Sequence, residues 1–350
     1  MHLSIVLFLA ALALVCQGCQ QPALPSATAS AALAATTPTV PASAAALADR
    51  YKQRVVHCCP PSFPNCDVYL CGTLHVAKTS SELVRDVIQS VKPDFVVLEL
   101  CESRIDSLYE LDIDENAFAN VTLVEVVKTA IRERSGKTLG MGLLTWVQVK
   151  AAKVMGSKLG GELSIAAKEG ATHRAIIVLG DRLYGVTIQR IMDRLRLLEK
   201  IKMAGLLFWE VLTMSVFKLK EYIVKSETDD AFIRDEVERF GRYLPTVADV
   251  IVSERDEYLA QTLLEIARVG FVRTSEAVKG PTDDQVRRGK IVAVVGAAHL
   301  AGVQRWLQQG GVSDARMAEI SSSSRHNATW PGGGMLQVVN TQALFGASNP

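Results

Sequence analysis

The sequence predicts an α/β fold: a mainly parallel sheet with flanking helices and a large helical insertion between the third and last core strands. Short apolar runs of strand length recur along the chain, and segments with helical patterning separate them. With 350 residues, of which 49% are hydrophobic, the chain can bury a sizeable core. The runs expected to form the four core strands are residues 68–71, 95–100, 175–179 and 291–295.

The first elements have the order of a βαβ unit. Residues 54–57 and 68–71 flank a proline-rich turn and predict an edge hairpin. Ser80 or Ser81 caps the helix that follows, and the strand over residues 95–100 comes next. Because a helical crossover of this kind joins parallel strands, the order predicts a parallel sheet with a right-handed connection.

Helical patterning fills most of the stretch between the third and last core strands. It covers residues 187–225 almost throughout, continues over 229–240 and resumes over 253–268. Residues 203–217 are the most apolar part, but a segment of this length, flanked by lysines and broken by a glutamate, is short for a membrane span. We expect a buried helix there, with interfacial or membrane-embedded packing as the alternative.

The two ends of the chain differ in composition from its centre. Residues 3–15 form an apolar run of signal-peptide length, and we expect a signal-like leader over residues 1–19. Residues 20–48 are mostly Ala, Pro, Ser and Thr, which predicts a flexible linker. The folded domain is expected over residues 50–318, followed by a low-complexity tail over residues 319–350. The leader favours the secretory pathway or membrane association, with a mitochondrial or chloroplast membrane as the alternative.

The charge of the chain argues against a nucleic-acid partner. The formal net charge is only +1, and acidic and basic residues are interleaved along the predicted helices. This pattern is typical of solvated helix faces and not of a phosphate-binding stripe. We therefore expect a peptide or small-molecule substrate and no nucleic acid.

The cysteines of the first hairpin leave two interpretations open. In an exported protein, Cys58 or Cys59 could pair with Cys66 across the proline-rich turn. A metal site is the weaker interpretation, because His57 and its neighbouring cysteines have no second pair of ligands at zinc-finger spacing. An odd number of cysteines leaves at least one thiol without a disulfide partner.

Two similar strings deliver histidines at predicted strand ends. Residues 72–75 read Gly-Thr-Leu-His and residues 296–299 read Gly-Ala-Ala-His, and an apolar run precedes each string. In parallel sheets, ligands and catalytic groups collect beyond the carboxyl ends of the strands. Neutral imidazole can bind a metal or act as a base near neutral pH. The repeated spacing predicts that His75 and His299 share one site.

Glu99 is a carboxylate inside a predicted buried strand. Burial of a carboxylate is costly unless the group is paired, hydrogen-bonded or bound to a cation. Arg104 is one candidate partner, and an ion pair between the two would fix the following loop. A metal ion or the two histidines are the other candidates.

Two further charged strings lie near predicted element ends. Asp181 and Arg182 follow the third strand, where they suit metal binding, histidine orientation or recognition of an anion, although Gly-Asp is also common in turns. Glu254, Arg255 and Asp256 begin a helix, where acidic residues are favoured by the helix dipole. Taken alone, this triplet is typical of a solvated face.

In this order, the strings resemble the TraB domain family (TraB/PrgY-like), which includes bacterial pheromone-shutdown proteins, eukaryotic TraB-domain proteins and the Tiki proteases. The resemblance covers roughly residues 54–306. The matching strings are residues 72–75, 97–101 with Arg104, 180–182 with Thr187 and Arg190, 254–256 with Tyr258 and Leu259, and 294–302.

The resemblance implies a parallel sheet with helices, as in erythromycin-esterase-like and ChaN-like proteins. It also implies metal-dependent peptide cleavage of the kind associated with the Tiki branch. Carried onto the matching positions, the metal-binding or catalytic set would be His75, Glu99 and His299. The residues that would line the pocket are Arg104, Asp181, Arg182, Glu254 and Arg255.

The sequence therefore predicts a metal-dependent hydrolase, most simply a peptidase. A divalent ion would activate water and polarise a carbonyl group, and an arginine would stabilise the developing oxyanion. Histidine and carboxylate ligands suit Mn, Co and Zn alike. Two alternatives stay open. One is a non-catalytic, membrane-associated regulatory or tethering protein, and the other is a metal-free hydrolase similar to erythromycin esterase, with His75 as the general base and Glu99 orienting it.

Overall fold

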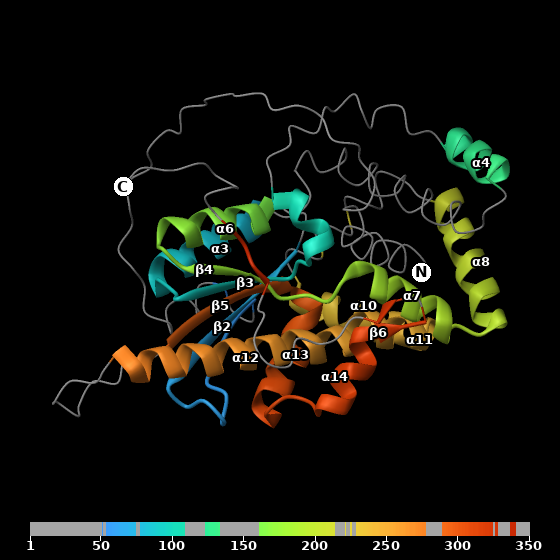
Figure 1. The fold of residues 1–350 in the computed structure, drawn as a ribbon. Coiled ribbons are helices and arrows are strands. Elements are labelled where there is room, and N and C mark those ends of the chain that lie inside the picture. The colour runs from blue at the N-terminus through green and yellow to red at the C-terminus, as the bar shows by residue number, and fades with distance from the viewer. Residues whose placement is uncertain are drawn as a thin grey trace.

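A six-stranded mixed sheet forms the centre of the computed structural model (Figure 1). The strand order is β1–β2–β5–β3–β4–β8; the four central strands run parallel, and both edge strands are antiparallel to their neighbours. The strands are β1 (Val55–Cys58), β2 (Cys66–Thr73), β3 (Phe95–Leu98), β4 (Ile176–Leu179), β5 (Gly289–Gly296) and β8 (Gln337–Val338). The α/β class and the parallel core predicted from the sequence are confirmed. The structure describes residues 51, 54–74, 78–108, 123–133, 161–213, 221, 225, 229–277, 289–324, 326–327 and 337–340.

Helices cover both faces of the sheet. In Figure 1, α3 (Lys78–Val91) and α6 (Gly161–Thr172) lie on one face, and α12 (Glu254–Ala277) and α13 (Leu300–Gln309) lie on the other. Every residue of β2 is buried, which is the pattern of a strand packed on both sides. The two apolar layers give the parallel strands the covered faces that they require.

Helices that lie between β4 and β5 in the sequence contribute to a third apolar cluster. Ile191, Phe240, Leu244 and Val250 are among its buried members. The helices between these two strands are α7 (Tyr184–Arg194), α8 (Leu197–Thr213), α10 (Asp230–Tyr243), α11 (Pro245–Ala248), a π-helix (Asp249–Ser253) and α12. Elsewhere lie a 3-10 helix (Glu102–Leu108), α4 (Leu123–Arg132), a second 3-10 helix (Ala297–His299), α14 (Asp314–Ser321), β6 (Ser322–Ser323) and β7 (His326–Asn327).

Helix α8 covers part of the segment for which we expected a buried helix. Met203 and Leu206 pack against the third apolar cluster, but Trp209 is 52% exposed. Residues 214–217 of the apolar segment lie outside the described residues. None of the helices in the described part of the chain is long and apolar enough to cross a membrane.

The structure describes part of the predicted tail but none of the predicted leader and linker. The predicted leader and linker lie outside the described residues, so the secretory or membrane localisation stays a prediction. From the predicted tail, β8 adds to the sheet edge: Val338 pairs with Val178 and Gln337 with Leu179. The backbone N–H of Val339 also donates to the Ile177 carbonyl at 2.9 Å.

Two details of the first βαβ unit differ from the sequence expectations. β1 and β2 form the expected edge hairpin, but β5 lies between β2 and β3, so the two strands of the unit are not neighbours. β3 ends at Leu98, which places Glu99 one residue beyond the strand and not inside it. None of the five cysteines in the described residues forms a disulfide, so the possible bridge from Cys58 or Cys59 to Cys66 is absent from the structure.

Candidate functional site

The carboxyl ends of three adjacent parallel strands bring charged residues together. Leu98 of β3 lies level with Val294 of β5 and with Leu179 of β4. The residues that follow these strands, Glu99, Asp181 and His299, are all buried. The expected convergence at this edge of the sheet is therefore observed for these three residues, as the topology of an open parallel sheet predicts.

Glu99 is held by a cation and by the backbone of β5. Its Oε1 atom accepts a hydrogen bond from the Arg255 guanidinium, and its Oε2 atom accepts one from the Gly296 N–H. Glu99 is 2% exposed and Arg255 is 1% exposed. The buried carboxylate thus has the compensating partners that its burial requires, and Arg255 supplies the charge.

His299 is fixed through both ring nitrogens. Its Nδ1 atom lies 2.6 Å from Asp256 Oδ1, and its Nε2 atom lies 3.2 Å from Arg255 Nη1 and 3.5 Å from Glu99 Oε1. Since a guanidinium can only donate, Nε2 is the acceptor in this arrangement and Nδ1 carries the proton that is donated to Asp256. The ring is therefore oriented with its Nε2 lone pair toward Glu99 and Arg255.

Asp181 completes this group, which we call the histidine cluster: Glu99, Asp181, Arg255, Asp256 and His299. The Arg255 guanidinium reaches Asp181 through two bonds, from Nε to Oδ1 at 3.1 Å and from Nη2 to Oδ2 at 2.7 Å. Within the cluster, Arg255 binds two carboxylates, Glu99 and Asp181, and the third carboxylate, Asp256, binds His299.

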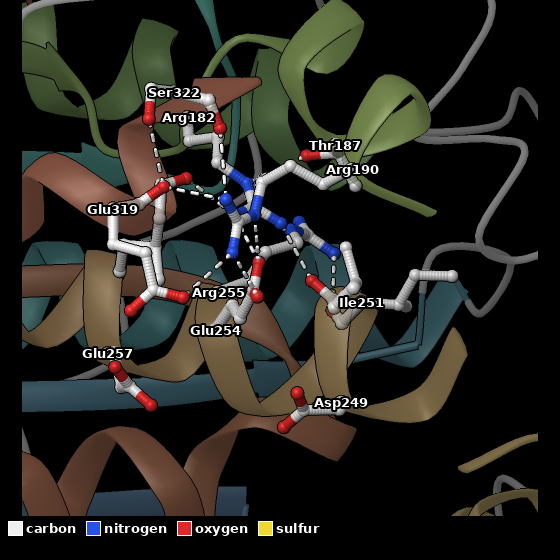
Figure 2. A network of polar contacts seen from close by, with 12 residues as sticks. Arg182, Thr187, Arg190, Asp249, Ile251, Glu254, Arg255, Glu257, Glu319 and Ser322 are labelled. Carbon is white, nitrogen blue, oxygen red and sulfur yellow. Dashed lines mark hydrogen bonds and ion pairs between the residues drawn. The ribbon is translucent and has the colours of Figure 1, made fainter. Parts of the chain in front are cut away.

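A second buried network, the Glu254 network, lies next to the histidine cluster at the start of α12 (Figure 2). Glu254 is fully buried and accepts hydrogen bonds from the guanidinium groups of Arg182, Arg190 and Arg194, at 2.7 to 2.8 Å. Burial alone would raise the pKa of the Glu254 carboxyl group, but the bonds and charges of Arg190 and Arg182 hold that pKa below its usual range.

The Glu254 network also anchors the last turn of α14 and the start of β6. Arg182 donates to the Ile320 carbonyl at 2.8 Å, and Arg190 donates to the Glu319 and Ser322 carbonyls at 2.6 and 3.0 Å. Figure 2 shows Glu319 and Ser322 beside the guanidinium group of Arg190. All three guanidinium nitrogens of Arg182 donate hydrogen bonds, to Thr187, Glu254 or backbone carbonyls, which gives this arginine a structural role.

Two glycines permit the close approaches on which the site depends. A Cβ atom at Gly72 would lie 2.3 Å from Leu300 Cδ1 and 2.8 Å from Leu300 Cγ, so a larger residue in β2 would have to displace the first side chain of α13. A Cβ atom at Gly302 would lie 1.8 Å from Asp256 Oδ2, so α13 leaves just enough room for the carboxylate that holds His299. Packing against α13 is therefore a physical reason for the glycine of the first string.

The structure places most of the predicted site residues in these two networks, but it does not describe His75. Glu99, Asp181, Arg255 and His299 share the histidine cluster, and Arg182 and Glu254 lie in the adjacent network. Arg104 is buried near Cys101, whose pKa is raised mainly by burial, with the Arg104 charge acting in the opposite direction. His75 lies outside the described residues, so its expected convergence with His299 stays a prediction.

The interpretation of residues 254–256 as a solvated face was wrong. Glu254, Arg255 and Asp256 are 0%, 1% and 4% exposed, because α12 begins beneath the strand ends and not at the surface. Asp256 and Arg190 are functional candidates that our site residues did not include. The signal for Asp256 was the position of three consecutive charges between the buried apolar residues 250–252 and 259–260. Burial raises the pKa of Asp256, against the opposing effect of the bond to His299.

Two residues of the histidine cluster, Glu99 and His299, have the chemistry and spacing of ligands to a divalent metal ion. Glu99 Oε1 and His299 Nε2 are 3.5 Å apart, close to the roughly 3.4 Å between two ligands of a tetrahedral ion with bonds near 2.1 Å. Asp256 holds the second ring nitrogen of His299, as a carboxylate commonly does for a metal-bound histidine. Arg255 contacts both ligand atoms, so an ion at this position would replace two contacts of a guanidinium that keeps Asp181 as its partner.

The fold and the site define an α/β protein with a buried cluster of histidine, carboxylates and arginine at the carboxyl ends of its parallel strands. The model of the TraB/PrgY/gumN family matches residues 62–313. This range includes every residue of the histidine cluster, and Glu254 with its three arginines, but it ends before α14, whose carbonyl groups Arg182 and Arg190 contact. The chain belongs to the TraB/PrgY/gumN family.

Curated relatives support the same assignment. The chain is 32% identical over 251 residues to the uncharacterized protein MJ1365 of Methanocaldococcus jannaschii, covering 70% of this chain and 54% of the relative. It is 31% identical over 245 residues to the TraB domain-containing protein of Bos taurus, and 30% identical over 245 residues to that of Homo sapiens. Each of these two matches covers 68% of this chain and 62% of the relative, so the chain spans little more than half the length of these proteins.

Proposed function

We propose that the chain is a metal-dependent hydrolase of peptide or related acyl bonds, with Glu99 and His299 as metal ligands. The observation that carries the proposal is the histidine cluster, in which the Glu99 carboxylate lies 3.5 Å from the Nε2 atom of a His299 ring that Asp256 orients. A buried carboxylate beside an oriented imidazole is a pair of ligands that suits a divalent cation.

Each residue of the cluster has a distinct role in this proposal. Glu99 and His299 would hold the ion, and His75 is the third ligand that the sequence offers. The ion, when bound, would lower the pKa of a water molecule and polarise the substrate carbonyl. Asp256 keeps the proton on Nδ1 of His299 and so presents the Nε2 lone pair. The Gly296 N–H fixes the second oxygen of Glu99.

Arg255 is the arginine best placed to stabilise a developing oxyanion. It contacts both proposed ligands, whereas the guanidinium of Arg182 is engaged by Glu254, Thr187 and backbone carbonyls. A cation that contacts the reacting centre stabilises negative charge as it forms in the transition state. Asp181 would hold Arg255 in position, because it accepts two hydrogen bonds from the guanidinium.

A second candidate is a metal-free hydrolase with His299 as the general base. The observation that favours it is the 2.6 Å contact between Asp256 and Nδ1 of His299. A carboxylate in this position orients an imidazole and stabilises the charged form that follows proton uptake. The base of this candidate differs from the His75 that the sequence suggested.

The experiment measures hydrolysis of a panel of peptides and esters by the full chain, first with chelator and then with added Mn²⁺, Co²⁺ or Zn²⁺. We expect chelation to abolish turnover, metal to restore it, and both Glu99→Gln and His299→Gln to lack it. His173→Gln is the matched control, because His173 is only half-buried and lies just before the start of β4, at the opposite end of that strand from the cluster.

Each outcome distinguishes the candidates. Turnover that persists with chelator but is lost in His299→Gln would replace the metal-dependent mechanism with the metal-free one. No turnover under any condition, or turnover that His299→Gln leaves at the level of His173→Gln, would refute both candidates and leave the non-catalytic regulatory or tethering function.

A further inference from the structure

A second group of metal-ligating side chains lies at the opposite end of β2. His57, Cys59 and Asp67 offer three ligand atoms that lie within 4.8 Å of one another. Asp67 is at the start of β2, six residues before Thr73, which corresponds to about 20 Å along a strand. The group is therefore separate from the histidine cluster at the carboxyl end of the sheet.

The edge hairpin places these three residues on one face. His57 pairs with Tyr69, and alternate residues of a strand share a face, so Asp67 lies on the same side as Tyr69 and His57. The His57 and Tyr69 rings lie against each other with centroids 4.7 Å apart, which limits the rotation of the imidazole. Sequence spacing did not indicate this site, because the third ligand comes from the second strand of the hairpin.

Two of the groups converge on one oxygen atom. His57 Nε2 lies 2.9 Å from Asp67 Oδ1, and Cys59 Sγ lies 3.3 Å from the same oxygen. Ligand atoms of a tetrahedral zinc ion, with bonds of about 2.0 to 2.3 Å, lie roughly 3.3 to 3.8 Å apart. Small side-chain rotations would therefore bring all three atoms to a common ion.

The loop that joins the strands is already ordered by its own hydrogen bonds. Phe63 N–H donates to the Pro60 carbonyl at 2.9 Å, and Cys66 N–H donates to the Phe63 carbonyl at 3.0 Å. Three prolines within residues 60–64 restrict the loop further. Because less freedom is lost when a preorganised set of ligands binds, this loop favours metal binding.

We propose that His57, Cys59 and Asp67 bind one divalent transition-metal ion of the zinc class. Binding releases the Cys59 thiol proton to solvent, and the imidazole coordinates through a neutral nitrogen. The thiolate and the carboxylate then balance the two positive charges of the ion. Since the His57 side chain is 40% exposed, the fourth coordination position faces solvent and takes a water molecule.

The neighbouring cysteine provides a matched control. Cys58 points to the other face of the hairpin, where it packs against the apolar layer of α12 and α13. A metal site at Cys59 should therefore not depend on Cys58.

The test is a titration of the reduced full chain with Co²⁺, in which the ultraviolet and visible absorption spectrum is measured at each addition. We expect a cobalt–thiolate charge-transfer band that saturates at one ion per chain and disappears when Zn²⁺ is added. The band should be absent in Cys59→Ser and retained in Cys58→Ser. Asp67→Asn should weaken zinc binding by about tenfold or more. His299→Gln should retain the band, which separates this site from the proposed hydrolase centre.

A measurement on the unmodified chain guards against variants that fail to fold. Zn²⁺ should slow alkylation of Cys59, identified by mass spectrometry, whereas Mg²⁺ should not, because it disfavours thiolate ligands. The proposal is overturned if no thiolate band forms, if the band survives in folded Cys59→Ser, if it is lost in folded Cys58→Ser, or if Zn²⁺ leaves the alkylation of Cys59 unchanged.

Discussion

Replacing Glu254 with glutamine should lower the free energy of unfolding by about 3–5 kcal/mol, the typical cost of breaking a buried ion pair by removing one partner. Glu254 is fully buried and forms ion pairs with Arg182, Arg190 and Arg194. A neutral glutamine would leave buried guanidinium charges without their counter-charge. The free energy is measured by urea denaturation of the variant and the parent chain.

Glu265→Gln on the same helix is the control. Glu265 pairs with Arg268 nearer the surface, where a single ion pair contributes about 1 kcal/mol or less. A loss in Glu254→Gln no larger than in the control would contradict the structural role of the Glu254 network.

The effect of Glu254→Gln should also depend on pH. The arginines lower the pKa of Glu254 in the folded chain, so the stabilisation is complete above the unfolded pKa of about 4.3 and is lost as the pH falls through the lower folded value. The difference between the parent and Glu254→Gln should therefore be constant near neutral pH and shrink in acid. A difference that grows as the pH falls would reverse the sign of this linkage.

Asp256→Asn should reduce hydrolysis by about 10–100-fold, the range found when the partner of a metal-binding histidine is removed. An asparagine amide can donate to Nδ1 and so force the proton of His299 onto Nε2, the atom that must act as ligand or base. The effect is measured as kcat/KM with the best substrate of the peptide and ester panel.

Gly302→Ala tests the same contact without a change of charge. The added methyl group would overlap Asp256 Oδ2 and displace the carboxylate from His299, so a similar loss of activity is expected. Asp235→Asn, at an exposed position of α10, is the control. Activity near that of the control in both folded variants would show that Asp256 does not position the histidine.

The sequence predicted the part of the site that depends on strand ends. Glu99 and His299 each follow an apolar run, and parallel strands bring their carboxyl ends to one edge. Of the candidate partners named for Glu99, His299 lies 3.5 Å from its Oε1 atom. The sequence did not point to Arg255 as a partner, because Arg255 reaches Glu99 from a helix 156 residues further along the chain.

Two other features of the sites depended on tertiary packing. Residues 254–256 resemble an exposed helix start, yet α12 begins beneath the sheet edge, so its charges are buried against each other. The His57 group needed the register of β1 against β2, because Asp67 becomes a neighbour of His57 only when the hairpin pairs. In both cases the decisive contacts form only when the chain folds.

Anomalous X-ray diffraction from crystals of the chain grown with Co²⁺ or Zn²⁺ tests the proposed hydrolase centre most directly. We expect a peak within about 2.0–2.2 Å of both Glu99 Oε1 and His299 Nε2, with Arg255 withdrawn from these atoms but still bound to Asp181. A separate peak at His57 would report only on the second site. Metal-containing crystals with no peak between Glu99 and His299, and with Arg255 still contacting both, would contradict the proposed centre.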